Sequence, residues 1–164
     1  MNPASEPGLL DAVLDCWERN NAVLINLLRA IPEDGLQARA LPGSPTAGQM
    51  YAHLHHERMV SVLENAPEHA GVIPAEEWRA EHDRQRIHEW LVESCQRVRA
   101  AVLSRIQSGR GLDKDFAHPI QLIPFLIFHE SYHHGQIKLA LKAAGSAIPD
   151  KVAGPLVWDV WRAR

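Results

Sequence analysis

The amino-acid sequence predicts an all-α protein, a four-helix up-down bundle followed by a short C-terminal helix. Apolar residues recur at intervals of three and four over four long segments. Proline and glycine gather between these segments, and no segment alternates apolar and polar residues with the period of a strand. The chain has 164 residues, the length of one domain, so we expect residues 1–164 to form a single helical bundle.

The first two helices are expected over residues 6–31 and 46–65. In the first, Pro32 ends a run of apolar residues at helical spacing. These are Leu10, Val13, Leu14, Trp17, Leu24, Leu27, Leu28 and Ile31. The second begins with a capping-box pattern: the Thr46 hydroxyl can accept from the Gln49 backbone amide, and the Gln49 side chain can reach back.

A long third helix is expected over residues 75–107 and a fourth over 121–144. The buried stripe of the third consists of Ile87, Leu91, Cys95, Val98, Val102 and Ile106. A short fifth helix is expected within residues 154–161. Trp158 and Trp161 are expected to pack back on the bundle.

Composition excludes several classes of function. The net charge is -3 with histidine counted as neutral, and no run of lysine and arginine suggests a nucleic-acid-binding surface. No apolar stretch is long enough to cross a membrane, and the N-terminal residues do not resemble a signal peptide. Two cysteines do not make a disulfide framework. We therefore expect a cytoplasmic protein that acts on a small molecule rather than on a nucleic acid or a membrane.

Histidine is the unusual residue, with ten in the chain. His129 and His133 are four residues apart in the predicted fourth helix, so they share one face. The same stripe contains Leu122, Leu126, Gln136 and Ala140. Two imidazoles therefore stand where apolar residues should face the core, whereas His134, about 100° further round, points elsewhere.

The second predicted helix repeats this arrangement. Its inward stripe consists of Met50, His53, Leu54, Glu57 and Val60. His55 falls on the far side of the helix. His56 lies at the margin, about 60° from His53 at 100° per residue, and is the one competitor for the same role.

Three inward imidazoles on two helices predict a metal site at His53, His129 and His133. Burying an unpaired polar group costs about 1 to 3 kcal/mol, and a shared divalent cation removes that cost. Neutral imidazole suits zinc, nickel, copper or iron. Three protein ligands with an open position are typical of a catalytic site, whereas structural zinc sites have four. Glu57 is the expected orienting group or occasional ligand.

Residues 129–133 also spell the H-E-x-x-H motif of zinc metalloproteases, in which Glu130 would be the general base. The motif requires a third ligand further along the chain. No glutamate follows Glu130 and no histidine follows at the required spacing, which leaves Asp150 and Asp159 as candidates. A protease is therefore the least favoured function, and Glu130 is kept as a candidate catalytic residue.

Two segments carry a family resemblance. Residues 46–54 read TAGQMYAHL and are followed by Glu57 and Arg58, and residues 129–137 read HESYHHGQI. Together with PLVWD at 155–159, they resemble the DinB superfamily, which includes the YfiT-like proteins, over nearly the whole chain.

The resemblance implies a four-helix bundle that binds one metal ion, usually nickel or zinc, through three histidines, which here are His53, His129 and His133. It also implies a homodimer. Some relatives are thiol-dependent transferases or isomerases that use bacillithiol, mycothiol or glutathione. His134 stands where an arginine is common, so any role of that arginine is not carried over.

Three functions remain open at this point. The first is a metal-dependent enzyme in which an open metal position lowers the pKa of a thiol, or of water in a hydrolase. The second is a non-enzymatic metal-binding or stress-response module. The third is a scaffold without metal. A low-molecular-weight thiol is the expected partner of the first.

Overall fold

In the computed structural model, which describes residues 8–162, the fold is entirely helical, as predicted. The helices are α1 (Leu9–Ala30), α2 (Ala47–Asn65), α3 (Arg84–Gln107), α4 (Leu122–Ala143) and α5 (Asp150–Arg162). Three short 3₁₀ helices, η1 (Gly35–Gln37), η2 (Pro67–His69) and η3 (Pro119–Gln121), lie in the connections. The predicted helix start at residue 6 lies outside the described residues.

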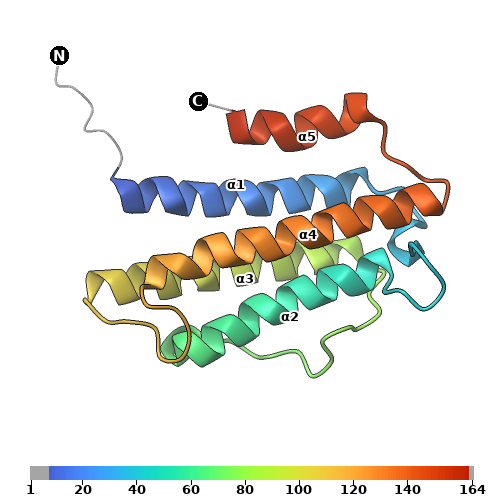
Figure 1. The fold of residues 1–164 in the computed structure, drawn as a ribbon. Coiled ribbons are helices and arrows are strands. Elements are labelled where there is room, and N and C mark those ends of the chain that lie inside the picture. The colour runs from blue at the N-terminus through green and yellow to red at the C-terminus, as the bar shows by residue number, and fades with distance from the viewer. Residues whose placement is uncertain (1–7, 163–164) are drawn as a thin grey trace, which may run out of the picture.

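Helices α1 to α4 pack side by side, and α5 lies along α1 (Figure 1). Two contacts fix the relative direction of α2 and α3. Gly48 lies against Glu81 just before α3 begins, and Asn65 at the end of α2 accepts from the Asp113 amide after α3 ends. The two helices therefore run in the same direction, and the strict up-down order that the sequence predicted is wrong for this pair.

The third helix begins at Arg84, nine residues later than the predicted start at 75. Asp83 caps it, because its side chain accepts from the backbone amides of Gln85 at 2.9 Å and Arg86 at 3.3 Å. Residues 66–83 are consequently a long connection that contains η2 and returns along the bundle (Figure 1). We call this segment the return loop.

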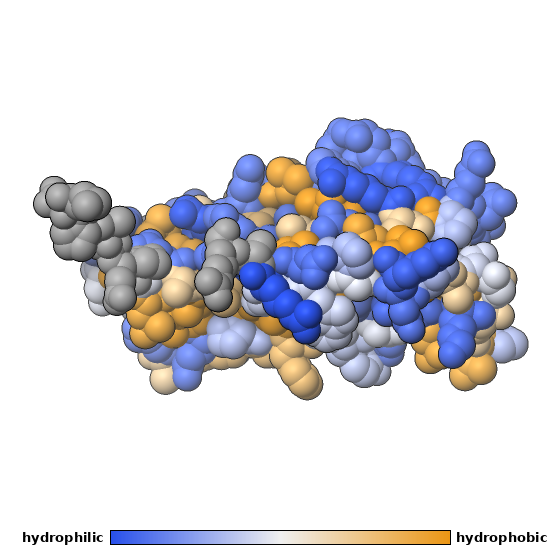
Figure 2. Space-filling view, turned by 90° about the horizontal axis from the view of Figure 1, so that it is seen from above, coloured by the Kyte–Doolittle hydropathy of each residue, from blue (hydrophilic) through white to orange (hydrophobic). Residues whose placement is uncertain are grey.

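The fifth helix is longer than predicted and starts at Asp150, so that Pro155 lies inside it. Two side chains of α1 bind it: Arg19 donates to the Val160 carbonyl at 2.6 Å and Asn26 to the Leu156 carbonyl at 3.2 Å. Apolar side chains reach the surface among polar ones on the face that carries α5 (Figure 2). Trp158, which was expected to pack back on the bundle, is 61% exposed.

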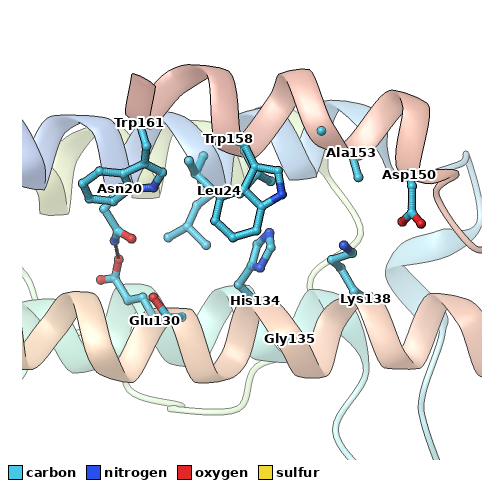
Figure 3. Close-up of a pocket in the computed structure, with 14 residues that line it drawn as sticks. Asn20, Leu24, Glu130, His134, Gly135, Lys138, Asp150, Ala153, Trp158 and Trp161 are labelled. Atoms are coloured by element: carbon cyan, nitrogen blue, oxygen red, sulfur yellow. Dashed lines mark hydrogen bonds between the residues drawn. The ribbon is translucent and has the colours of Figure 1, made fainter. Parts of the chain in front are cut away.

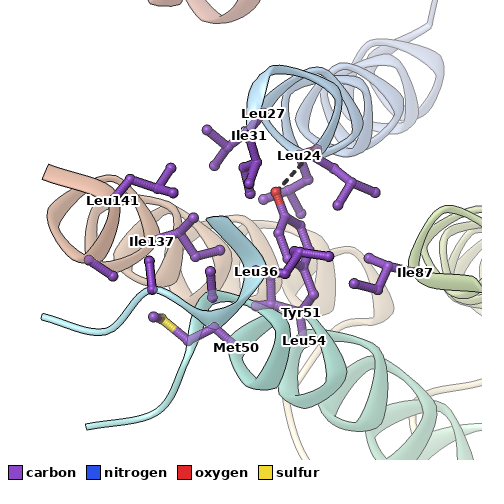
Figure 4. Close-up of a cluster of buried hydrophobic side chains, with 14 of the residues drawn as sticks. Leu24, Leu27, Ile31, Leu36, Met50, Tyr51, Leu54, Ile87, Ile137 and Leu141 are labelled. Carbon is purple, nitrogen blue, oxygen red and sulfur yellow. Dashed lines mark hydrogen bonds between the residues drawn. The ribbon is translucent and has the colours of Figure 1, made fainter. Parts of the chain in front are cut away.

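The core around the first turns of α2 joins α1, α2, α3 and α4 (Figure 4). Leu54, Leu91 and Ile137 are completely buried there. Tyr51 is also buried, and its hydroxyl donates to the Leu24 carbonyl at 3.2 Å. This packing fixes the rotation of α2 and α4, and with it the direction in which their histidines point.

None of the described helices is both long and apolar enough to span a bilayer.

Candidate metal centre

Helices α2 and α4 bring together the three histidines that the sequence predicted to converge. The Nε2 atom of His129 lies 3.1 Å from Nε2 of His53 and 3.2 Å from Nε2 of His133. His53 and His133 are buried, and His129 is partly exposed. Among residues 8–162 these three form the one cluster of histidine, cysteine and carboxylate side chains arranged to hold a metal ion. We call them the histidine triad.

The distances within the histidine triad fit a metal ion better than a hydrogen-bond network. Nε2 of His129 carries either one proton or one lone pair, so it cannot make a full hydrogen bond to both of its neighbours. Ligands 2.0 to 2.1 Å from a tetrahedral zinc would place their nitrogens about 3.3 Å apart. The separations of 3.1 and 3.2 Å are close to that value, so a divalent cation would satisfy all three nitrogens at once.

The environment of the histidine triad favours the neutral form of two of its imidazoles, those of His53 and His133. Burial, together with the smaller effects of the neighbouring His129 and His53, lowers the pKa of His133 to about 4. Burial also lowers the pKa of His53, against an opposing effect of Glu77. Since only the neutral ring presents a lone pair to a metal, these two ligands are ready for binding at neutral pH.

The pH at which the histidine triad should release a bound metal ion follows from these lowered pKa values. Protons and metal compete for the same nitrogens, but a group with a pKa of about 4 takes up little proton at neutral pH. Bound metal should therefore be retained at pH 6 and released as the pH falls toward about 4. Equilibrium dialysis against a pH series, with circular dichroism to follow the helices, measures this. Half-release above about pH 6, where an ordinary histidine titrates, would contradict it.

The return loop supplies two contacts to His53 that the sequence did not predict. Oε1 of Glu77 lies 2.9 Å from Nδ1 of His53. The Trp78 ring stacks on the His53 ring, with centroids 4.0 Å apart and planes 5° apart. A carboxylate on Nδ1 fixes the tautomer in which Nε2 is free for a metal. Glu57, the expected orienting group, instead accepts a hydrogen bond from the Ser61 hydroxyl at 3.4 Å.

The position of the return loop depends on its close contact with α2. A Cβ atom on Gly48 would lie 2.1 Å from the Glu81 carbonyl oxygen, so only glycine fits there. Gln49 holds the same stretch from the side, because its Nε2 donates to the Trp78 carbonyl at 3.0 Å. These contacts carry Glu77 and Trp78 to His53.

Replacing Glu77 by alanine should weaken metal binding by about 10- to 100-fold, the range found when the hydrogen-bond partner of a ligand histidine is lost. The matched control is Glu76→Ala, an exposed neighbour without a contact to the histidine triad in the described chain. Competition with a chromophoric chelator measures both affinities. Equal affinities for the two variants would show that Glu77 does not orient His53.

Three aromatic side chains border the histidine triad on its exposed side, and we call them the aromatic rim. Trp78, Phe125 and Tyr132 are 37, 41 and 60% exposed. The Phe125 ring is inclined by 11° to that of His129, with centroids 6.4 Å apart, and the Tyr132 ring meets that of His133 at 5.2 Å. A molecule that approaches the metal position from solvent would pass between apolar rings.

The remaining histidines of the two clusters lie outside the histidine triad. His55 stacks on Trp90, and its Nδ1 lies 3.1 Å from the Trp90 carbonyl oxygen. His56, the competitor of His53, is not part of the ligand cluster. His134 is not part of the cluster and points toward α5 (Figure 3). Asp150 and Asp159, considered as third ligands, lie on α5 and are not part of the cluster either.

Glu130 is completely buried and takes part in an ion pair in the core. Its Oε1 accepts from Nε of Arg58 at 2.6 Å and its Oε2 from Nη2 of Arg58 at 2.8 Å. Oε2 also accepts from Asn20 at 2.5 Å (Figure 3). Both oxygens accept hydrogen bonds within the core. This favours a structural role for the Glu130 carboxylate over the role of general base that the H-E-x-x-H motif suggests.

Arg58 completes this network and was not assigned a role from the sequence. Its Nη1 donates to Asn21 at 2.9 Å, to the Leu91 carbonyl at 3.1 Å and to Ser94 at 3.2 Å. Its guanidinium also lies 4.6 Å from the centroid of the Trp17 ring. The network ties α2 to α1, α3 and α4 immediately beside the ligand-bearing turn of α4.

Comparison with known proteins gives one family. The model of the DinB family matches residues 5–153. No curated protein and no solved structure shows significant similarity to the chain.

Proposed function

The chain belongs to the DinB family, and we propose that it is a metal-dependent enzyme that binds one zinc or nickel ion through His53, His129 and His133. The observation that carries this proposal is the convergence of three imidazole nitrogens from two helices without a fourth ligand side chain among the described residues. Three protein ligands leave a position free for a substrate.

The proposed reaction is the transfer of a low-molecular-weight thiol to an apolar electrophile. A divalent metal with a free position supplies Lewis acidity, which lowers the pKa of a thiol. The sulfur forms a bond to the electrophilic carbon, the leaving group departs with its bonding electrons, and the thiol proton passes to solvent. The aromatic rim supports this proposal, since Trp78, Phe125 and Tyr132 offer an apolar surface to the electrophile and exclude water from it.

A hydrolase that uses the same centre is the second form of the enzyme proposal, and a non-enzymatic metal-binding or stress-response module is the alternative. The H-E-x-x-H protease is least favoured, because Glu130 is paired with Arg58.

Protein purified without a metal-affinity column should contain about one metal ion per chain by elemental analysis.

Activity assays separate these functions. Glutathione, bacillithiol and mycothiol are each tested with 1-chloro-2,4-dinitrobenzene, and 4-nitrophenyl acetate tests for hydrolysis. Turnover that is lost in His129→Ala and kept in His56→Ala supports the enzyme. A stoichiometric metal without turnover in any assay supports the binding module, and the absence of metal overturns both.

We also propose that the protein forms a homodimer in the cytoplasm. The support is a row of exposed apolar side chains on α4, in which Phe128, Tyr132 and Leu139 are 77, 60 and 57% exposed. These residues are spaced by four and seven positions and so share one helix face. Sedimentation velocity at micromolar concentration tests this, with Phe128→Glu as the variant expected to dissociate. A monomeric parent protein would refute the dimer.

A further inference from the structure

A cavity lies along a different face of α4 from the one that carries His129 and His133. It has a volume of about 590 Å³ and is enclosed by α1, α4 and α5 (Figure 3). This volume is within the range of about 300 to 1,000 Å³ that is usual for small-molecule sites. The cavity exists because the hydrogen bonds from Arg19 and Asn26 hold α5 on α1, which leaves space between α5 and α4.

Two glycines inside helices keep this space open. Gly135 of α4 and Gly154 of α5 both line the cavity, and a Cβ atom on either would meet no other atom within 4 Å. Neither glycine is therefore needed for close packing, in contrast to Gly48. Glycine within a helix costs about 1 kcal/mol relative to alanine. No close contact in the folded chain requires glycine at these two positions. The open width of the cavity beside them is the one structural feature that accounts for this cost in stability.

The polar groups of the cavity leave a cation without a partner. Lys138 lines it and forms no ion pair with any residue from 8 to 162. Nε2 of His134, one turn away, is buried and has no hydrogen-bond partner within the same residues. Glu130, at the inner end, is already neutralised by Arg58. Asp150, on the opposite wall, lies in the first turn of α5, where the helix dipole stabilises its charge.

Apart from Asn20 and Ser131, the rest of the lining is apolar and comes from α1 and α5. Val23 and Leu24 of α1 form one wall, and Val157, Trp158 and Trp161 of α5 form the other. The indole of Trp158 points toward His134 across the cavity (Figure 3). A ligand that fits this lining has an apolar or aromatic body and one anionic group at the end where Lys138 and His134 lie.

We propose that this cavity binds a small amphipathic carboxylic acid, with its carboxylate at Lys138 and His134 and its body between α1 and α5. The site is separate from the histidine triad, so the proposal does not depend on the proposed enzymatic function. An unpaired lysine is attracted to a carboxylate by charge and hydrogen bonding together, and the aromatic walls bury the apolar body.

The test uses 2-naphthoate as the probe and isothermal titration calorimetry as the measurement. The protein is first stripped of metal with a chelator, so that the carboxylate cannot bind at the histidine triad. We expect one site per chain. Lys138→Gln should weaken naphthoate binding about tenfold, whereas Lys142→Gln, an exposed lysine on the same helix that does not line the cavity, should leave the affinity unchanged.

Two further arms test the location of the site and the class of ligand. Gly135→Leu fills open space and improves helix propensity, so it should abolish binding while the thermal midpoint stays the same or rises. The uncharged analogue 2-naphthamide should bind the parent about tenfold more weakly than naphthoate and should be insensitive to Lys138→Gln. The proposal is overturned if naphthoate does not bind, if Gly135→Leu folds and still binds it, or if the amide binds equally well.

Discussion

Replacing Arg58 by methionine should lower the free energy of unfolding by about 3 to 5 kcal/mol, one of the largest effects expected in this protein. Arg58 and Glu130 are both completely buried. Methionine keeps much of the side-chain volume but leaves the Glu130 carboxylate without its cation in the core. An isolated buried charge is far more costly than the pair, because its desolvation is no longer offset by a partner.

Two controls give this prediction its specificity. The double variant Arg58→Met with Glu130→Leu removes both charges and should recover much of the lost stability, since an apolar pair can replace a buried ion pair at little cost. Arg99→Ala breaks the exposed Arg99–Glu18 pair, which has the same chemistry on the surface, and should cost about 1 kcal/mol or less. Urea unfolding of metal-free protein measures all three. A loss for Arg58→Met no greater than that for Arg99→Ala would contradict the argument.

The helices and the histidine triad were predictable because both depend on short-range periodicity. His129 and His133 share a face of α4 whatever surrounds them, and His53 falls in the middle of the apolar stripe of α2. The capping box at Thr46 and Gln49, present in the structure, fixed the start of that helix. Each of these inferences uses residues that are close in the sequence.

The direction of α3 was missed because the preceding connection was predicted to be too short. A connector limited to residues 67–74 can span about 27 Å, barely the length of α2, and therefore favours antiparallel neighbours. The actual return loop, residues 66–83, can reach about 60 Å and allows the chain to come back before α3 begins. Residues 75–83 have a composition typical of a helix, so they were assigned to the third helix instead of to this loop. For the same reason the contacts of Glu77 and Trp78 with His53 were not predicted.

Contacts between elements that are distant in sequence account for the other omissions. Arg58 was noted only as part of the segment that carries the family resemblance, and Glu130 was interpreted by itself as a candidate general base. A charged residue in a helical pattern is ordinarily placed toward solvent. The packing of α2 against α4 brings these two opposite charges, 72 residues apart in the sequence, together in the core. There each charge neutralises the other.

The choice between His53 and His56 can be decided by metal binding. His53→Ala should abolish stoichiometric binding, because a site built from three imidazoles loses one of its ligands and also the Glu77 contact that orients it. His129→Ala and His133→Ala should behave in the same way. His56→Ala should leave the metal content of the purified protein close to that of the parent, since His56 is not part of the ligand cluster.

The measurement is elemental analysis of each variant after purification without a metal-affinity column, followed by competition with a chelator to compare affinities. Circular dichroism verifies that each variant keeps its helices, so that loss of metal is not a consequence of unfolding. The variants need not be equally stable. His53 and His133 are buried, and alanine at either leaves a small cavity, whereas His56 is only partly buried. If His56→Ala loses the metal while His53→Ala retains it, then α2 presents a different face to α4 in solution, and the assignment of the histidine triad is wrong.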